Sequence, residues 1–129
     1  MTTRRKPTRI RLPVTRTGIT HKFEVGDVDG YITTGEYENG SLGEVFITIA
    51  KEGSTLSGVM DSLATVTSIS LQYGVPLRTL VDKMMLRRFP PDGITSNPEI
   101  KFATSIVDYI FKWLGKRYLS EKDRKELDL

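Results

Sequence analysis

The segment from residue 51 to residue 85 constrains the fold most, because a strand-like pattern changes there into a helical one. Apolar residues then recur at intervals of three and four, the spacing of one helical face; they are Leu56, Val59, Met60, Leu63, Val66 and Ile69. The opposite face carries side chains short enough for another backbone to approach closely, namely Ser57, Gly58, Ser62, Ala64, Thr65, Thr67 and Ser68. We therefore expect a helix that packs on more than one side.

A second, shorter helix is predicted directly after the first. Gly74 suits the end of a helix, and Pro76 suits a first helical turn, where the missing N–H costs nothing. The apolar pattern of the second helix is Leu77, Leu80, Val81 and Met84.

Three strands are predicted before the two helices. The first strand has an alternating apolar and polar pattern that includes Phe23 and Val25. The second covers residues 31–37, and the third covers residues 42–49 (LGEVFITI). The segments GDVDG (26–30) and ENGS (38–41) are predicted turns, since glycine supplies positive φ readily. Short turns between successive strands predict an antiparallel meander.

The end of the chain predicts a loop and a last helix. Three prolines and a glycine make residues 87–98 (RRFPPDGITSNP) an irregular loop. Asn97 is the expected N-cap of a helix that runs from Pro98 to Tyr118. This helix has two apolar stripes, one of which carries the aromatic residues Phe102, Tyr109 and Trp113. That stripe is either a surface for self-association and docking or simply core.

At 129 residues the chain is long enough for a single core. The predicted fold is α+β, a three-stranded antiparallel meander followed by three helices packed on one face. Residues 1–18 are expected to be a flexible basic arm, 19–119 the domain, and 120–129 a charged tail that frays. No run approaches the ~20 apolar residues of a membrane span, and no secretory signal opens the chain, so the sequence predicts a cytoplasmic protein without a membrane partner.

The charge is unevenly distributed. The first 16 residues contain six basic and no acidic side chains, whereas residues 17–129 carry 13 basic and 16 acidic ones. Clustered cations release counterions from phosphate, so the arm is a candidate for binding nucleic acid or an acidic protein surface. The residues involved would be Arg4, Arg5, Lys6, Arg9 and Arg11. The alternative is a solubilising tail or a linker.

Composition limits the chemistry of this chain. Without cysteine it has no disulfide, thiolate ligand or thiol nucleophile, and a single histidine cannot form a multi-histidine metal site. The acidic segment GDVDG lacks the ligand spacing of a calcium loop, so no metal site is predicted. His21 is either a general base or an ordinary strand-start histidine, and no catalytic residue is assigned.

Two further segments are candidate binding sites. Gly53, Ser54 and Thr55 at a helix start offer backbone N–H groups and hydroxyls to an anion, although ordinary helix capping uses the same residues. The helix pair around Gly74 superficially resembles a prokaryotic helix-turn-helix, with Arg78, Thr79 and Lys83 facing a DNA groove. In the latter case the protein would be a small nucleic-acid-binding protein that uses the basic arm as well.

Residues 20–119 closely resemble a known module, the C-terminal TSCPD domain of the adenosylcobalamin-dependent (class II, vitamin B12-dependent) ribonucleotide reductases. The resemblance rests on the ordered runs AKEGST, SGVMDS, LQYGVPL and NPEI, followed by IVDYIF, and covers about three-quarters of the chain.

The resemblance implies a role in deoxyribonucleotide synthesis and DNA replication. It assigns the catalytic barrel, the cobalamin and the reactive cysteines to the family's catalytic domain, so no cofactor is expected in this chain and no activity by itself. The expected function is that of a non-catalytic accessory or regulatory module that docks onto a reductase catalytic chain, with homo-oligomerisation as a further possibility. Gly53, Ser54, Thr55, Arg87 and Arg88 are the residues expected to contact a nucleotide or the reductase body.

Overall fold

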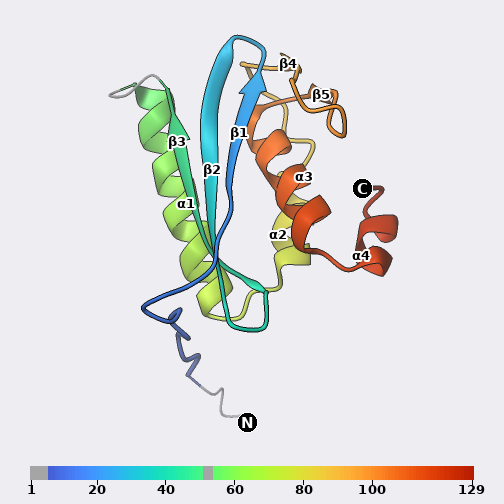
Figure 1. The fold of residues 1–129 in the computed structure, drawn as a ribbon. Helices are drawn as coiled ribbons and strands as arrows, with labels where there is room; N and C mark the ends of the chain where they lie inside the picture. The colour runs from blue at the N-terminus through green and yellow to red at the C-terminus, as the bar shows by residue number, and fades with distance from the viewer. Residues whose placement is uncertain (1–5, 51–53) are drawn as a thin grey trace.

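The computed structural model describes residues 6–50 and 54–129 (Figure 1). The order of elements is β1 (Thr20–Val25), β2 (Val28–Glu36), β3 (Leu42–Ile49), α1 (Thr55–Gln72), α2 (Leu77–Met84), β4 (Gly93–Ile94), β5 (Phe102–Ala103), α3 (Ile106–Tyr118) and α4 (Glu121–Glu126). The predicted α+β class and the three-stranded meander are confirmed. None of the helices in the described residues is both long and apolar enough to cross a membrane.

The main sheet has the strand order β1-β2-β3, and both pairs of neighbours are antiparallel. The first turn needs only Gly26 and Asp27, since Val25 already pairs with Val28, and Gly26 adopts a φ of 59°. The second turn contains Gly40 at a φ of 86°. Both turns therefore use the positive φ that glycine allows without strain.

The core lies on one side of the sheet. The side chains of Phe23, Ile32, Ile47 and Ile49 point to this side and are buried, together with most of α3. Figure 1 shows α3 beside β1 and α1 beside β3, and α2 packs against α3. The other side of the sheet exposes Tyr31 and Phe46, whose side chains alternate with those of the core.

Helix α1 covers the free edge of β3. The Ser68 hydroxyl accepts a hydrogen bond from the Val45 N–H (2.8 Å) and lies 3.1 Å from the Val45 carbonyl oxygen. One turn further on, the Gln72 side-chain amide donates to the Gly43 carbonyl oxygen at 3.0 Å. Side-chain groups of α1 thus satisfy backbone groups that an uncovered edge strand would leave unpaired.

This arrangement corrects the predicted orientation of α1. Met60 is buried as expected, but Val59, Val66 and Ile69, which share its predicted stripe, are exposed. The helix instead buries Ala64 and Thr67, which belong to the predicted small face. The physical reason is the close approach to β3, because only short side chains leave room for Ser68 to reach the strand backbone.

The last long helix begins later than predicted. Ser105 is its N-cap and accepts a hydrogen bond from the Asp108 N–H at 2.9 Å, whereas Asn97 caps a turn by accepting from the Glu99 N–H. The segment between these caps includes β5, which pairs with β4. β4 lies within residues 87–98, which we expected to be an irregular loop. The helix cannot extend back to Pro98, because Phe102 and Ala103 are extended and pair with β4.

Both ends of the chain have more contacts than a frayed tail would have. From Arg9 onward the N-terminal segment hydrogen-bonds to the body, as when the Ile10 N–H donates to the Gln72 carbonyl and Arg16 pairs with Glu44. The C-terminal segment forms α4 and buries Leu127. These contacts involve parts of the two segments that we expected to be a flexible arm and a fraying tail.

Candidate functional site

A row of exposed apolar side chains runs along α1. We define the α1 outer face as Val59, Ser62, Val66, Ile69 and Tyr73, which recur every three or four residues. Val59 is 58% exposed, Val66 61%, Ile69 38% and Tyr73 43%. The face is therefore a mainly apolar stripe on a helix whose opposite side is already occupied by β3.

Polar groups on this side of α1 are mostly satisfied within the helix. The hydroxyls of Ser62, Thr65 and Ser70 donate to carbonyl oxygens four residues earlier, at 2.8 to 3.0 Å. Asp61 is the one charged residue among the 18 of α1. A solvated helix face normally carries several charges, so this composition is typical of a surface that another protein covers.

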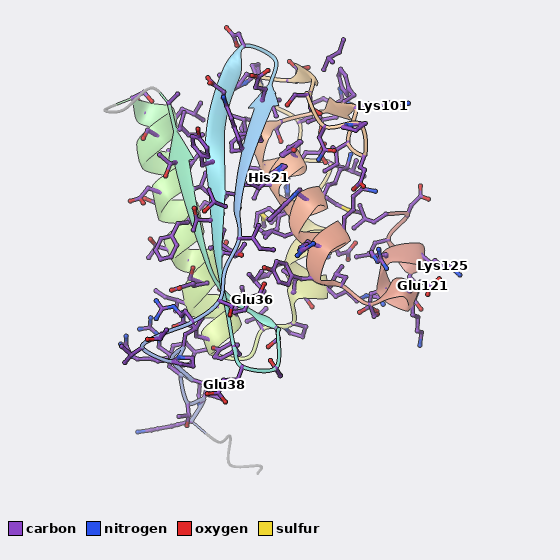
Figure 2. The ribbon with its side chains drawn as sticks, in the orientation of Figure 1. His21, Glu36, Glu38, Lys101, Glu121 and Lys125 are labelled. Carbon is purple, nitrogen blue, oxygen red and sulfur yellow. The ribbon has the colours of Figure 1, made fainter. Side chains whose placement is uncertain are left out.

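A second feature is an aromatic cluster between β1 and α3. The Nε2 atom of His21 lies 2.8 Å from the Tyr109 hydroxyl oxygen, which also accepts a hydrogen bond from the Asn97 side-chain amide at 3.2 Å. The direction of the 2.8 Å contact depends on the His21 tautomer, and in one of the two arrangements the Tyr109 hydroxyl donates to Nε2. The neutral His21 ring then carries its own proton on Nδ1. Figure 2 shows His21 on β1, on the side toward α3.

The rings of this cluster lie nearly parallel. His21 stacks on Trp113 with a centroid distance of 4.7 Å and an interplanar angle of 12°. Tyr109 stacks on Phe23 with a centroid distance of 5.5 Å. Burial lowers the pKa of His21 below its usual 6.5 and raises the pKa of Tyr109 above 10. Burial therefore favours the neutral form of both side chains.

A cleft of about 390 Å³ opens beside this cluster. Its lining residues come from β1 and the chain just before it, from the loop before β5 and from the end of α3, and are Ile19, His21, Glu99, Trp113, Lys116 and Arg117. Trp113, Lys116 and Arg117 share one face of α3, because they are spaced by three and four residues. Within the described ranges neither Lys116 nor Arg117 has an acidic partner at ion-pair distance.

The anion-binding residues that we predicted lie in different places. Gly53 is outside the described residues, Ser54 is the N-cap of α1 and accepts from the Ser57 N–H, and Thr55 is exposed at the first position of the helix. Arg87 and Arg88 are exposed after α2, and the Arg87 side chain donates to the Lys83 carbonyl oxygen. The hollow beside Ser54 is lined by residues of β3 and α1, without either arginine.

The basic arm is partly engaged with the body. Arg4 and Arg5 lie outside the described residues, and Lys6 and Arg11 are exposed. Arg9 donates to the Gln72 side-chain oxygen at 2.7 Å. Arg11 lines a groove of about 700 Å³ between the arm, the β2–β3 turn and the end of α1.

The predicted aromatic stripe is not one surface. Tyr109 is completely buried, Trp113 is partly buried in the cleft, and Phe102 is 51% exposed on β5. The three residues belong to different environments because the helix begins only at Ile106. A docking surface that includes Tyr109 is therefore excluded.

The predicted DNA-reading helix is also partly occupied. Arg78 pairs with Asp123 at 2.7 Å and with Glu126, so its guanidinium group binds α4. Thr79 and Lys83 remain exposed on α2. In the described part of the chain, no three histidine or acidic side chains converge where they could hold a metal ion.

The α1 outer face and the cleft were both missed as sites by sequence reasoning. The near absence of charged residues in α1 could have indicated the α1 outer face, since a helix of that length rarely exposes so few ionisable residues. The cleft gave no such signal, because His21 and Trp113 are far apart in the chain.

Comparison with known proteins identifies this α+β module. Residues 4–118 match the TSCPD domain model, and the chain therefore belongs to the TSCPD domain family. No solved structure matches the chain.

Its relatives are vitamin B12-dependent ribonucleotide reductases. The chain is 52% identical over 118 residues to the protein of Rhodopirellula baltica, covering 92% of this chain and 11% of the relative. The corresponding values are 47% identity over 124 residues for Streptantibioticus cattleyicolor (96% and 21%) and 44% over 121 residues for Bradyrhizobium diazoefficiens (93% and 10%). The chain thus spans only about a tenth to a fifth of the length of these relatives.

Proposed function

We propose that this protein is a non-catalytic accessory module of vitamin B12-dependent ribonucleotide reductase, which acts in deoxyribonucleotide synthesis by docking onto a reductase catalytic chain. The family relationship supports the link to the reductase. The composition supports a non-catalytic role, since a chain without cysteine cannot supply the thiols that we assigned to the catalytic domain. Adenosylcobalamin would then be bound by the catalytic chain.

The docking surface in this proposal is the α1 outer face, and its exposed apolar stripe is the observation that carries the proposal. In the Rhodopirellula relative, the region that matches this chain is only 11% of the protein, so the remainder is a body several times larger than the module. A module joined to such a body is expected to keep one uncharged surface for it. The hydroxyls of Ser62 and Thr65 do not oppose this contact, because their protons already bond to helix carbonyls.

The test mixes the protein with a vitamin B12-dependent reductase catalytic chain that lacks the matching region, and measures complex formation by light scattering on a sizing column. We expect a stable complex with the natural sequence. Val66→Asp places a carboxylate at the centre of the contact and should weaken the complex at least about tenfold, since an unpaired buried charge costs more than 1.4 kcal/mol.

Val14→Asp is the matched control, because Val14 is fully exposed on the N-terminal segment and the substitution is chemically the same. It should leave the complex unchanged. If the natural sequence forms no complex, or if both variants bind equally well, docking through α1 is wrong. If instead the protein forms a dimer that Val66→Asp dissociates, the occupant of the face is a second copy of this chain, and the proposed partner is wrong.

A further inference from the structure

The cleft between β1 and α3 combines features that a ligand site needs and that docking through α1 does not use. We propose that it binds a small planar anion, an aromatic ring that carries a phosphate or carboxylate group, of which a nucleoside monophosphate is the type. The ring would stack in the aromatic cluster and the anionic group would contact Lys116 and Arg117. This inference is independent of the proposed docking function.

The shape of the cleft supports a ligand of this class. Its volume of about 390 Å³ lies within the range of small-molecule pockets, roughly 300–1,000 Å³. Trp113 is only partly buried, and one of its faces is already stacked on His21 at 4.7 Å. A planar ligand can extend this stack, which is a favourable way to bind an aromatic ring because parallel offset rings attract each other.

The charge of the cleft supports an anionic ligand. Lys116 and Arg117 come from the last turn of α3, and Glu99 comes from the loop opposite, so two cations face one carboxylate. Both cations lack an ion-pair partner in the described part of the chain, whereas Lys112, one turn earlier, is paired with the buried Asp108 at 3.2 Å. Lys116 and Arg117 can therefore bind a phosphate without breaking an existing salt bridge.

His21 adds an imidazole ring held in position. Its Nε2 contacts the Tyr109 hydroxyl, which also accepts from Asn97, so a ligand would meet the ring through Nδ1. Tyr109 and Asn97 are thus positioning residues, while His21, Trp113, Lys116 and Arg117 would touch the ligand. The structure therefore offers a stacking surface, an imidazole ring and two cations within one cleft.

Trp113 is the sole tryptophan of the chain, so its fluorescence reports the cleft directly. The experiment titrates the full chain with adenosine 5′-monophosphate, adenosine and inorganic phosphate in parallel. We expect saturable quenching with adenosine monophosphate, binding at least about tenfold weaker with adenosine, because charge-assisted hydrogen bonds are lost, and no quenching with phosphate alone.

Charge variants assign the effect to the cleft. The double variant Lys116→Gln, Arg117→Gln should weaken the binding of the monophosphate about tenfold or more and leave that of adenosine unchanged. Lys101→Gln, Lys122→Gln is the matched control, since both residues are exposed and neither lines the cleft. Figure 2 shows Lys101 at the β4–β5 end of the molecule.

Three results would overturn the proposal. The first is no saturable fluorescence change with the monophosphate, and the second is equal affinity for monophosphate and adenosine. The third is a loss of affinity in the Lys101, Lys122 pair as large as in the Lys116, Arg117 pair, which would indicate nonspecific attraction. None of these results would affect the docking proposal, because the α1 outer face is tested with other variants and another partner.

Discussion

Helices α1 and α3 use apolar residues in opposite ways. Helix α3 buries eight of its 13 residues, and its apolar stripes lie in the core under the sheet. Helix α1 buries only four of 18, and keeps Val59, Val66 and Ile69 exposed. The difference follows from position, since α3 lies over the sheet face while α1 lies along its edge. An apolar stripe on a helix therefore does not by itself identify the core side.

The strongest contrast is expected between core and surface truncations of similar size. Ile110→Ala in α3 removes a completely buried side chain and should lower the free energy of unfolding by about 2–5 kcal/mol. Val66→Ala on the α1 outer face should change it by no more than about 0.5 kcal/mol. Urea unfolding followed by circular dichroism measures both values. A loss above about 2 kcal/mol for Val66→Ala would show that this face is covered in the free protein, contrary to the comparison.

A smaller effect is expected at the edge of β3. Ser68→Ala removes the hydroxyl that binds the Val45 N–H, and should cost about 1–3 kcal/mol because this backbone group lies beside a helix that shields it from water. Ser62→Ala is the matched control, since its hydroxyl bonds only within α1. The same unfolding experiment compares them. Equal costs for the two variants would mean that the edge contact does not anchor α1.

Local patterns were sufficient to predict much of the fold. Alternation and glycine turns predicted the three strands, and the three-and-four spacing predicted a helix close to Thr55–Gln72. Local patterns could not predict which side of α1 is buried, because this depends on Ser68 and Gln72 reaching β3 across 23 and 29 residues of sequence. They also could not show that β5 interrupts the expected last helix, because its pairing with β4 is a tertiary contact.

The candidate sites were less predictable than the fold. The contact between His21 and Tyr109 joins residues 88 positions apart, and nothing in the neighbourhood of either residue indicates the other. The predicted arginines Arg87 and Arg88 line neither the hollow beside Ser54 nor the cleft. The residues that line the cleft come together through the packing of β1 against α3, which sequence periodicity does not specify.

The smallest expected effect concerns the polar contact that joins β1 to α3. Burial lowers the pKa of His21 in the folded state, so the unfolded chain, with a pKa near 6.5, binds a proton more readily. Stability from this residue should therefore be complete above pH 6.5 and decline as the pH falls through the lowered pKa of the folded state. His21→Gln should remove this part of the pH dependence, so the difference in unfolding free energy between the two proteins should be flat above pH 6.5 and change below it.

Proton NMR measures the same property directly, because His21 is the only histidine and its ring signals are unambiguous. We expect a pKa below 6.5 in the natural sequence. If the Tyr109 hydroxyl donates to Nε2, Tyr109→Phe should raise that pKa, because a donor to the neutral ring is lost; if the ring donates to the hydroxyl, the pKa should fall. A His21 that titrates at 6.5 or above, and does not respond to Tyr109→Phe, would show that the ring is solvated and that α3 meets β1 through apolar contacts alone. In that case the hydrogen bond between His21 and Tyr109 would be wrong. The contrast between the buried α3 and the exposed α1 outer face would be unaffected, because the truncation variants test it separately.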